Sequence, residues 1–176
     1  MDFKSLPSKT RFIAFVATSL DGRISLSSKS LPDWTSKEDQ EFFQKSLARF
    51  DAVVVGRNTY QAAAFRLRQR NTFVLSSRIK TIQHRGKVTF VNPARVKMAE
   101  LFQNYKTVAV LGGGAVYGYM LEQGFLDEIF VTLEPLIFGR GKEMFIGGTR
   151  TTRVNLLSVK QLNNLGTLLL RYKVIS

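Results

Sequence analysis

The sequence contains no cysteine and a single histidine among its 176 residues. Without thiols the chain has no disulfide framework, no thiolate nucleophile and no cysteine ligands for a metal. We therefore expect no metal site, and a reducing compartment such as the cytoplasm fits this composition. No apolar stretch of the signal-peptide type follows Met1, and no apolar run approaches the length of a membrane span.

Acidic residues are also scarce, because 13 Asp and Glu stand against 26 Lys and Arg, for a formal charge of +13. Residues 66–106 hold 10 of the basic residues and one acidic residue, Glu100. Such an excess attracts polyanions, so a non-catalytic polyanion-binding protein is one candidate class. The absence of a nucleic-acid-binding motif and of interleaved basic and aromatic residues argues against nucleic acid. A solvated basic face and a phosphorylated small-molecule ligand are the alternatives.

Residues 107–118 read TVAVLGGGAVYG, an apolar run followed by three glycines and a short helical pattern. Glycines between a strand and a helix let a ligand approach the backbone, and a helix N-terminus favours a phosphate. A tight turn without a ligand explains the same residues equally well. Tyr117 occupies the place of the last glycine in G-x-G-x-x-G, and no Lys-Ser or Lys-Thr follows, so the run is not a P-loop.

Apolar runs alternate with helical patterns for most of the chain, which predicts one three-layer α/β domain with a mostly parallel sheet. A flexible lead-in is expected over residues 1–10 and the domain over 11–176, ending in an antiparallel hairpin. The predicted strands cover 12–18, 52–55, 72–75, 87–91, 108–111, 126–133, 155–162 and 167–174. Helices are predicted from the capping-box spacing at Thr35–Glu38 and over 60–65, 94–104 and 115–123. Residues 20–32 and 136–148 are expected to form loops.

Polar or glycine-rich motifs directly follow three predicted strands. They are Gly56–Thr59, Ser76–Arg78 and Gly112–Gly114. In parallel sheets, ligands bind beyond the carboxyl ends of the strands, so these motifs are expected to face one site. Glycine admits a phosphate to the backbone, whereas Arg and Ser supply hydrogen-bond donors. A pyrophosphate at the glycines, with an extra phosphate near Arg57 and Ser76–Arg78, would describe NADPH.

The order of these motifs resembles the dihydrofolate reductase-like superfamily, in particular the reductase domain at the C-terminus of RibD, the bifunctional riboflavin-pathway enzyme. The resemblance runs from about Arg11 to Arg171. Its markers are ATSLDGRIS (17–25), WTS (34–36), DAVVVGRNTY (51–60), FVLSSR (73–78), VLGGGAVYG (110–118) and LDEIFVTLEPLIFGRG (126–141).

The resemblance implies hydride transfer from NADPH to a small heterocyclic substrate. It assigns cofactor binding to Ala17 beside the nicotinamide, to Gly56, Arg57 and Thr59 at the phosphates, to Ser76, Ser77 and Arg78 at the 2′-phosphate, and to Gly112, Gly113, Gly114 and Val116 at the pyrophosphate. Relatives of this fold often pair, so a homodimer is also expected.

Two substrates compete within the superfamily. Trp34 and Asp39 are spaced as in dihydrofolate reductase, and Thr132 matches the threonine that partners the aspartate there, so Asp39 and Thr132 are the catalytic candidates. A solvated first-turn acid is the simpler explanation of Asp39. Other features resemble the riboflavin type and favour reduction of a phosphoribosylamino-pyrimidine. The substrate-side candidates are Arg23, Ser25, Trp34 and Glu134, with Ser27, Ser28 and Lys29 beside a ribose phosphate.

Two features depart from the riboflavin enzymes. Leu111 stands before the glycines, where those reductases usually carry glutamate. The zinc deaminase half of the bifunctional enzyme is also missing, since the chain has no cysteine. His84 lies in a basic segment away from every motif and is expected in a surface loop.

Overall fold

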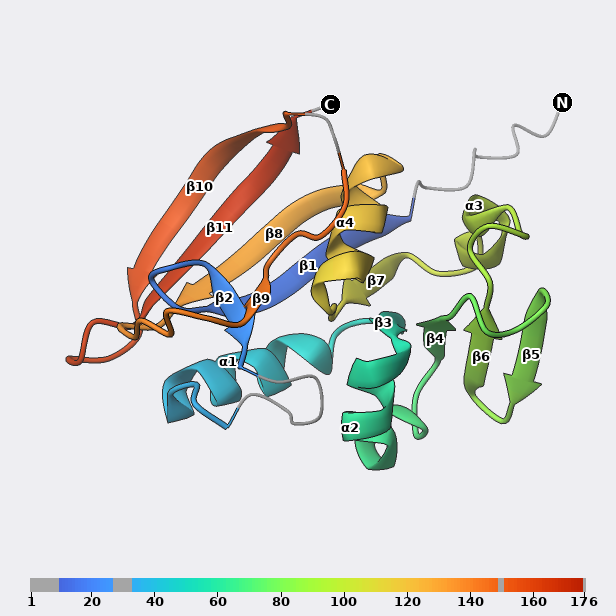
Figure 1. Cartoon of the computed structure of the whole chain (residues 1–176), viewed down its shortest axis with the longest axis horizontal. Coiled ribbons are helices and arrows are strands. Elements are labelled where there is room, and N and C mark those ends of the chain that lie inside the picture. The colour runs from blue at the N-terminus through green and yellow to red at the C-terminus, as the bar shows by residue number, and fades with distance from the viewer. Residues whose placement is uncertain (1–9, 27–32, 149–150, 176) are drawn as a thin grey trace, which may run out of the picture.

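In the computed structural model, which describes residues 10–26, 33–148 and 151–175, a nine-stranded sheet forms the middle of the molecule (Figure 1). The order across the sheet is β10 (Arg153–Gln161), β11 (Leu168–Ile175), β8 (Leu126–Leu133), β1 (Arg11–Thr18), β7 (Thr107–Val110), β3 (Ala52–Gly56), β4 (Thr72–Leu75), β6 (Val88–Val91) and β5 (Ile82–Arg85). The six strands from β8 to β6 run parallel, whereas β10, β11 and β5 pair antiparallel with their neighbours. The predicted three-layer α/β fold with a C-terminal hairpin is confirmed.

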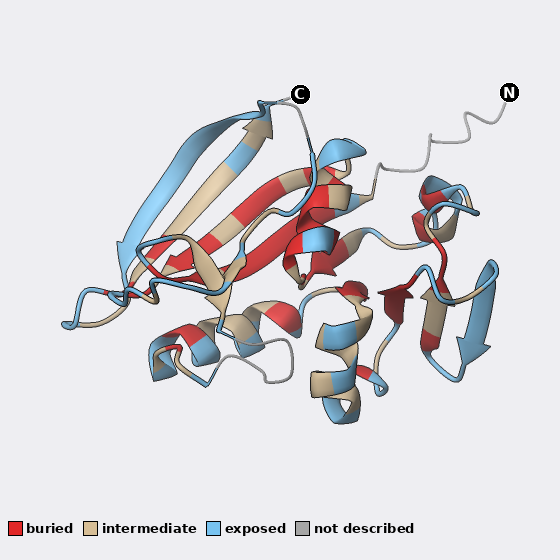
Figure 2. Ribbon diagram, viewed as in Figure 1, coloured by how far each residue is buried: buried red, intermediate tan, exposed pale blue. Residues whose placement is uncertain are grey.

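Both faces of the central strands are buried, as the red ribbon of Figure 2 shows. On β1, Phe12, Ala14 and Val16 face α3 (Met98–Phe102) and α4 (Gly114–Glu122). Ile13 and Phe15 face the other layer, α1 (Lys37–Leu47) and α2 (Arg57–Leu67). This two-sided burial explains why β1 is a nearly continuous apolar run. Within the described ranges, no helix is both long and apolar enough to cross a membrane.

The helices begin at residues other than the predicted ones, and local hydrogen bonds explain two of these differences. Ser36, rather than Thr35, caps α1, because its hydroxyl accepts the N–H of Asp39 while Thr35 is buried. The helix expected over 60–65 begins directly at Arg57, with Gly56 as its N-cap. The helix expected over 94–104 is confined to α3, because Asn92 holds residues 92–95 in a turn: its side chain accepts the N–H of Ala94.

Three short strands lie where loops were expected. β5, which contains His84, forms the exposed edge of the sheet against β6. The loop prediction for His84 is therefore wrong, although its prediction as a surface residue is correct. β2 (Arg23–Ser25) pairs antiparallel with β9 (Lys142–Glu143), so segments from distant parts of the chain form a small separate sheet. Of the lead-in expected over 1–10, residues 1–9 lie outside the described ranges.

Asp21 fastens the turn after β1 to the segment after β8. Its carboxylate accepts the hydroxyl of Ser19 at 2.6 Å and the N–H groups of Phe138 and Gly139 at 3.0 and 2.9 Å. These hydrogen bonds, that of Ser19 most of all, lower the pKa of Asp21 from its ordinary 3.8 to about 2.

We expect Asp21→Asn to lower the melting temperature at pH 7. A depressed pKa stabilises the fold above the unfolded value of 3.8, and that stabilisation is lost as the pH falls through about 2. The difference between the two proteins should therefore be largest at pH 5–7 and disappear toward pH 2, as thermal unfolding monitored by circular dichroism will measure. A melting-temperature difference between the two proteins that does not change with pH would contradict the role of the Asp21 charge.

Candidate active site

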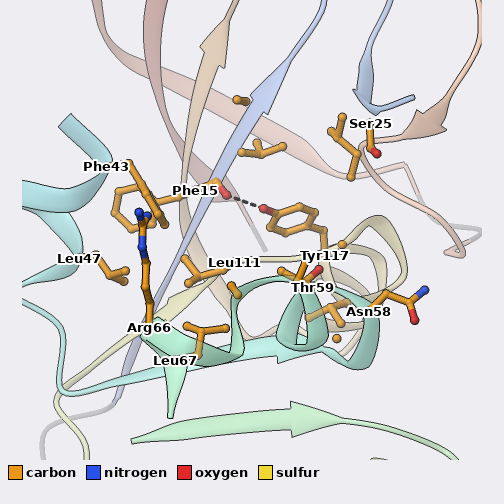
Figure 3. Close-up of a pocket in the computed structure, with 18 of the residues that line it drawn as sticks. Phe15, Ser25, Phe43, Leu47, Asn58, Thr59, Arg66, Leu67, Leu111 and Tyr117 are labelled. Carbon is orange, nitrogen blue, oxygen red and sulfur yellow. Dashed lines mark hydrogen bonds between the residues drawn. The ribbon is translucent and has the colours of Figure 1, made fainter. Parts of the chain in front are cut away.

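A cleft of about 1660 Å³ opens at the carboxyl ends of β1, β3, β4 and β7, between the helices of one face and the small β2–β9 sheet (Figure 3). Single small-molecule sites typically measure about 300–1,000 Å³. The volume therefore suffices for two ligands lying side by side. Residues of the cleft come from every motif that the sequence placed after a strand, including Gly56, Ser76 and Gly113.

Hydrogen bonds bring the three strand-end motifs together. The N–H of Gly56 donates to the carbonyl of Gly112 at 2.7 Å, which joins the end of β3 to the end of β7. Gly56 is also in register with Leu75, the residue before Ser76. Gly112 has φ +84°, and a Cβ there would lie 2.5 Å from the Tyr117 ring, so only glycine fits. The Gly112–Gly113 peptide bond is cis.

Two helices begin at this edge of the sheet on glycine. α2 has Gly56 as its N-cap and α4 has Gly113, and neither helix start carries a side-chain cap. A helix N-terminus without a cap offers N–H donors and partial positive charge to an anion. A Cβ on Gly113 would come within 3.8 Å of the Thr59 hydroxyl, on the cleft side.

The cofactor-side candidates lie along this cleft with one exception. The lining includes Ala17, Gly56, Arg57, Thr59, Ser76, Ser77, Arg78, Gly113, Gly114 and Val116. Gly112 is buried just behind it and supports the turn. Arg57, Ser77 and Arg78 supply the cation and hydroxyl donors that an extra phosphate requires.

Asp39 and Thr132 meet on the opposite side of the cleft. The Thr132 hydroxyl donates to Oδ1 of Asp39 at 2.6 Å. Asp39 is only 8% exposed, whereas its neighbours Glu38 and Glu41 are exposed. Burial raises the pKa of Asp39; the Thr132 hydrogen bond lowers it, and the charge of Glu134 raises it further. Ala17 is in register with Thr132 on the adjacent strand, so it lies beside this pair.

Of the substrate-side candidates, Ser25 lines the cleft and three others lie apart from its lining. Arg23 places its guanidinium 3.5 Å from Glu143, across the β2–β9 pair. Trp34 packs edge-on against Phe138, with ring centroids 5.0 Å apart. Glu134 is buried beneath the start of α1. Ser27, Ser28 and Lys29 lie outside the described residues.

Sequence reasoning missed the part of the cleft between α1 and α2. Arg66 of α2 reaches toward Phe43 of α1 (Figure 3), and Arg70 donates to the carbonyl of Leu47 at 3.1 Å. Partial burial lowers the pKa of Arg70. The available signal was the run of basic residues at Arg66, Arg68 and Arg70, at the end of α2 and in the turn that follows it. Lys37 and Lys142 also line the cleft, so cations surround it on several sides.

The strand order and the cleft at the carboxyl ends define a dihydrofolate reductase-like α/β protein. The chain belongs to the RibD C-terminal domain family, whose model matches residues 11–167. An uncharacterized protein of Bacillus subtilis, YwjB, is 26% identical over 159 residues, which cover 85% of this chain and 90% of that protein.

Two solved structures share the fold. A pyrimidine reductase-like protein of Corynebacterium diphtheriae matches with a TM-score of 0.76 at 17% identity, covering 99% of this chain and 97% of that one. The dihydrofolate reductase of Enterococcus faecalis, in complex with NADP(H), matches with a TM-score of 0.66 at 21% identity, covering 97% of this chain and 100% of that one. At these identities the two structures establish the fold alone.

Proposed function

We propose that the protein is an NADPH-dependent reductase that reduces a phosphoribosylamino-pyrimidine of riboflavin biosynthesis. The observation that carries this proposal is the joining of two features in one cleft. Three strand ends that carry glycine, Arg and Ser residues suited to an anion lie on one side, and a buried carboxyl, that of Asp39, lies on the other. The family to which the chain belongs supports the same class of reaction.

The residues present fit NADPH. The glycine-started, uncapped helices α2 and α4 suit its pyrophosphate, since no side chain blocks their N–H groups. Arg57, Ser77 and Arg78 suit the 2′-phosphate that distinguishes NADPH from NADH. When bound, NADPH supplies the hydride, and the protein contributes orientation and electrostatics.

The chain's own contribution to the reaction centres on Asp39. Because burial raises its pKa, the carboxyl keeps a proton to a higher pH than an exposed aspartate does. The Thr132 hydroxyl holds this carboxyl in a fixed orientation at the cleft, where it can meet an amino-heterocycle. In this arrangement Asp39 binds the ring and supplies the proton that accompanies reduction.

Dihydrofolate is the second candidate substrate, and one specific observation favours it. The Thr132–Asp39 hydrogen bond reproduces the aspartate–threonine pairing that the sequence shares with dihydrofolate reductase. The deciding experiment follows NADPH oxidation with purified protein and either the deaminated phosphoribosylamino-pyrimidine or dihydrofolate. Turnover of the pyrimidine alone supports the first proposal. Turnover of dihydrofolate that is lost in Asp39→Asn would replace it with the second.

We expect Arg57→Ala, Ser77→Ala and their combination to remove the preference for NADPH over NADH. Hydrogen bonds to a charged group contribute about 1.5–3 kcal/mol each, so KM for NADPH should rise about 10- to 100-fold while KM for NADH changes little. Stabilisation by each nucleotide in a thermal-shift titration measures the same preference without a substrate.

Arg68→Ala is the matched control for this prediction. Arg68 is the C-cap of α2, is exposed and does not line the cleft; its guanidinium lies 5.4 Å from the centre of the Phe65 ring. It should leave nucleotide preference unchanged. An intact preference in the Arg57 and Ser77 variants would refute the 2′-phosphate assignment.

A further inference from the structure

Glu134 is a buried carboxyl at the end of β8 whose two oxygens both have partners. Oε1 accepts the backbone N–H of Ser36 at 2.7 Å, and Oε2 accepts the Thr167 hydroxyl at 2.7 Å. Its own N–H donates to the carbonyl of Thr18 at 2.9 Å. The residue is 3% exposed. Glu134 therefore joins the end of β1, the start of α1 and the start of β11.

The contacts of Glu134 bear directly on Asp39, because Ser36 is the N-cap of α1. The Ser36 hydroxyl accepts the N–H of Asp39 at 3.3 Å, while Thr132, two residues before Glu134, donates to the Asp39 carboxyl. The end of β8 thus contacts α1 at two points. Glu134 accepts the backbone N–H of the N-cap, Ser36, and Thr132 donates to the third residue of the helix, Asp39. These contacts fix where the Asp39 side chain enters the cleft.

Glu134 also acts on Asp39 through its charge. Burial is the largest cause that raises the pKa of Asp39, and the Glu134 charge adds to it, whereas hydrogen bonds from Thr132 and Thr35 oppose it. The cleft that Asp39 lines also holds charged residues from α1 itself and from other elements: Asp33, Lys37, Glu41, Lys45, Arg57, Arg66, Arg70, Arg78 and Lys142. Glu134 is the charged residue that acts on Asp39 from the sheet.

We propose that Glu134 is a positioning residue of the active site, which anchors the start of α1 and favours the proton-bearing form of the Asp39 carboxyl. The role of Asp39 in catalysis rests on the reductase function proposed above. The coupling between the two carboxyls does not, and it is measured without a substrate.

The test is a ¹³C NMR titration of the aspartate and glutamate carboxyl carbons in the whole chain. In Glu134→Gln the amide oxygen still accepts the Ser36 N–H, so the fold is retained while the charge is removed. We expect the titration midpoint of Asp39 to move to lower pH in this variant. Glu38→Gln removes an exposed charge from the same helix and should leave the midpoint unchanged.

A third variant separates the charge of Glu134 from its hydrogen bonds. Thr167→Val removes the donor to Oε2 and keeps the carboxylate. The Asp39 midpoint should stay as high as in the wild type. An unchanged midpoint in Glu134→Gln, or a decrease as large in Thr167→Val, would overturn the proposal.

The pH dependence of kcat/KM provides the catalytic readout. If turnover requires protonated Asp39, Glu134→Gln should shift the basic limb of the profile to lower pH, and Thr167→Val should not. Absence of turnover with every substrate tested would reject the proposed function, yet the titration would still report on the Glu134–Asp39 pair.

Discussion

Replacement of Asp39 by asparagine is expected to lower kcat/KM by about 100-fold or more, the contribution typical of a general acid. Asparagine keeps the oxygen that accepts the Thr132 hydroxyl, so the side chain retains its place but has no proton of suitable acidity to give. The loss should appear mainly in kcat, because the shape of the site is preserved. Steady-state NADPH oxidation, with whichever of the two candidate substrates the protein turns over, measures it.

The same substitution is expected to raise the melting temperature at neutral pH. The folded-state pKa of Asp39 lies above its ordinary 3.8, so the folded protein holds this proton more tightly than the unfolded chain. The stability linked to this proton is fully present below 3.8 and is lost as the pH rises through the folded pKa. The asparagine side chain carries no charge at any of these pH values, and its advantage over the aspartate should therefore grow between pH 4 and pH 8.

Glu38→Gln is the matched control, since Glu38 is the preceding residue on the same helix and its exposed carboxylate accepts from Asn163. It should retain full activity. Two results would contradict the role proposed for the buried carboxyl. One is an Asp39→Asn protein with wild-type activity. The other is a stability difference between Asp39→Asn and the wild type that favours the variant less at pH 8 than at pH 4.

Replacement of Gly118 by alanine should destabilise the protein by about 2–3 kcal/mol, the cost of overpacking a filled interior. A Cβ at this position of α4 would overlap the carbonyl oxygen of Ile146, a backbone atom that cannot rotate away. Glycine to alanine within a helix would otherwise stabilise by about 0.5–1 kcal/mol, so a net loss identifies the contact. Urea unfolding measures the free energy.

The Gly118→Ala substitution would displace the segment 142–146, which forms part of the wall of the cleft. Lys142 and Ile146 line it, and the N–H of Ile146 donates to the carbonyl of Gly114 at 3.1 Å. NADPH binding should therefore weaken together with stability. Glu122→Gln changes an exposed residue at the last position of the same helix, away from the cleft lining, and should change the unfolding free energy by less than about 0.5 kcal/mol. A Gly118→Ala protein as stable as this control would refute the close packing.

The parts of the fold that could be predicted are those whose local pattern and tertiary burial agree. β1, β3, β4 and β7 are buried on both faces, so each reads in the sequence as a nearly continuous apolar run. β5 reads IQHR and is exposed throughout, and it becomes a strand only because β6 offers a free edge. β2 and β9 are similarly defined by their pairing, which no local pattern reveals.

The sequence predicted the strand-end side of the candidate site more completely than the side that contains Asp39. The strand-end motifs could be located from the sequence, because each follows its strand directly in the chain, and the structure brings them to one cleft. The substrate side depends on which residue of a helix faces inward. Asp39 lies between Glu38 and Gln40 in a polar stretch, and only packing shows that it is buried. The partnership of Glu134 with Ser36 depends on tertiary contact between distant segments, which the sequence pattern does not contain.

The central place of β1 has a consequence for biosynthesis. This first strand hydrogen-bonds β7 on one side and β8 on the other, both of which leave the ribosome long after it. The apolar side chains of β1 therefore remain exposed, without their native partners, while the middle of the chain is synthesised. Such non-local pairing slows folding and exposes the nascent chain to aggregation. Because β8 supplies Thr132, a chain that ended before β8 would carry the strand-end motifs without the Asp39–Thr132 pair.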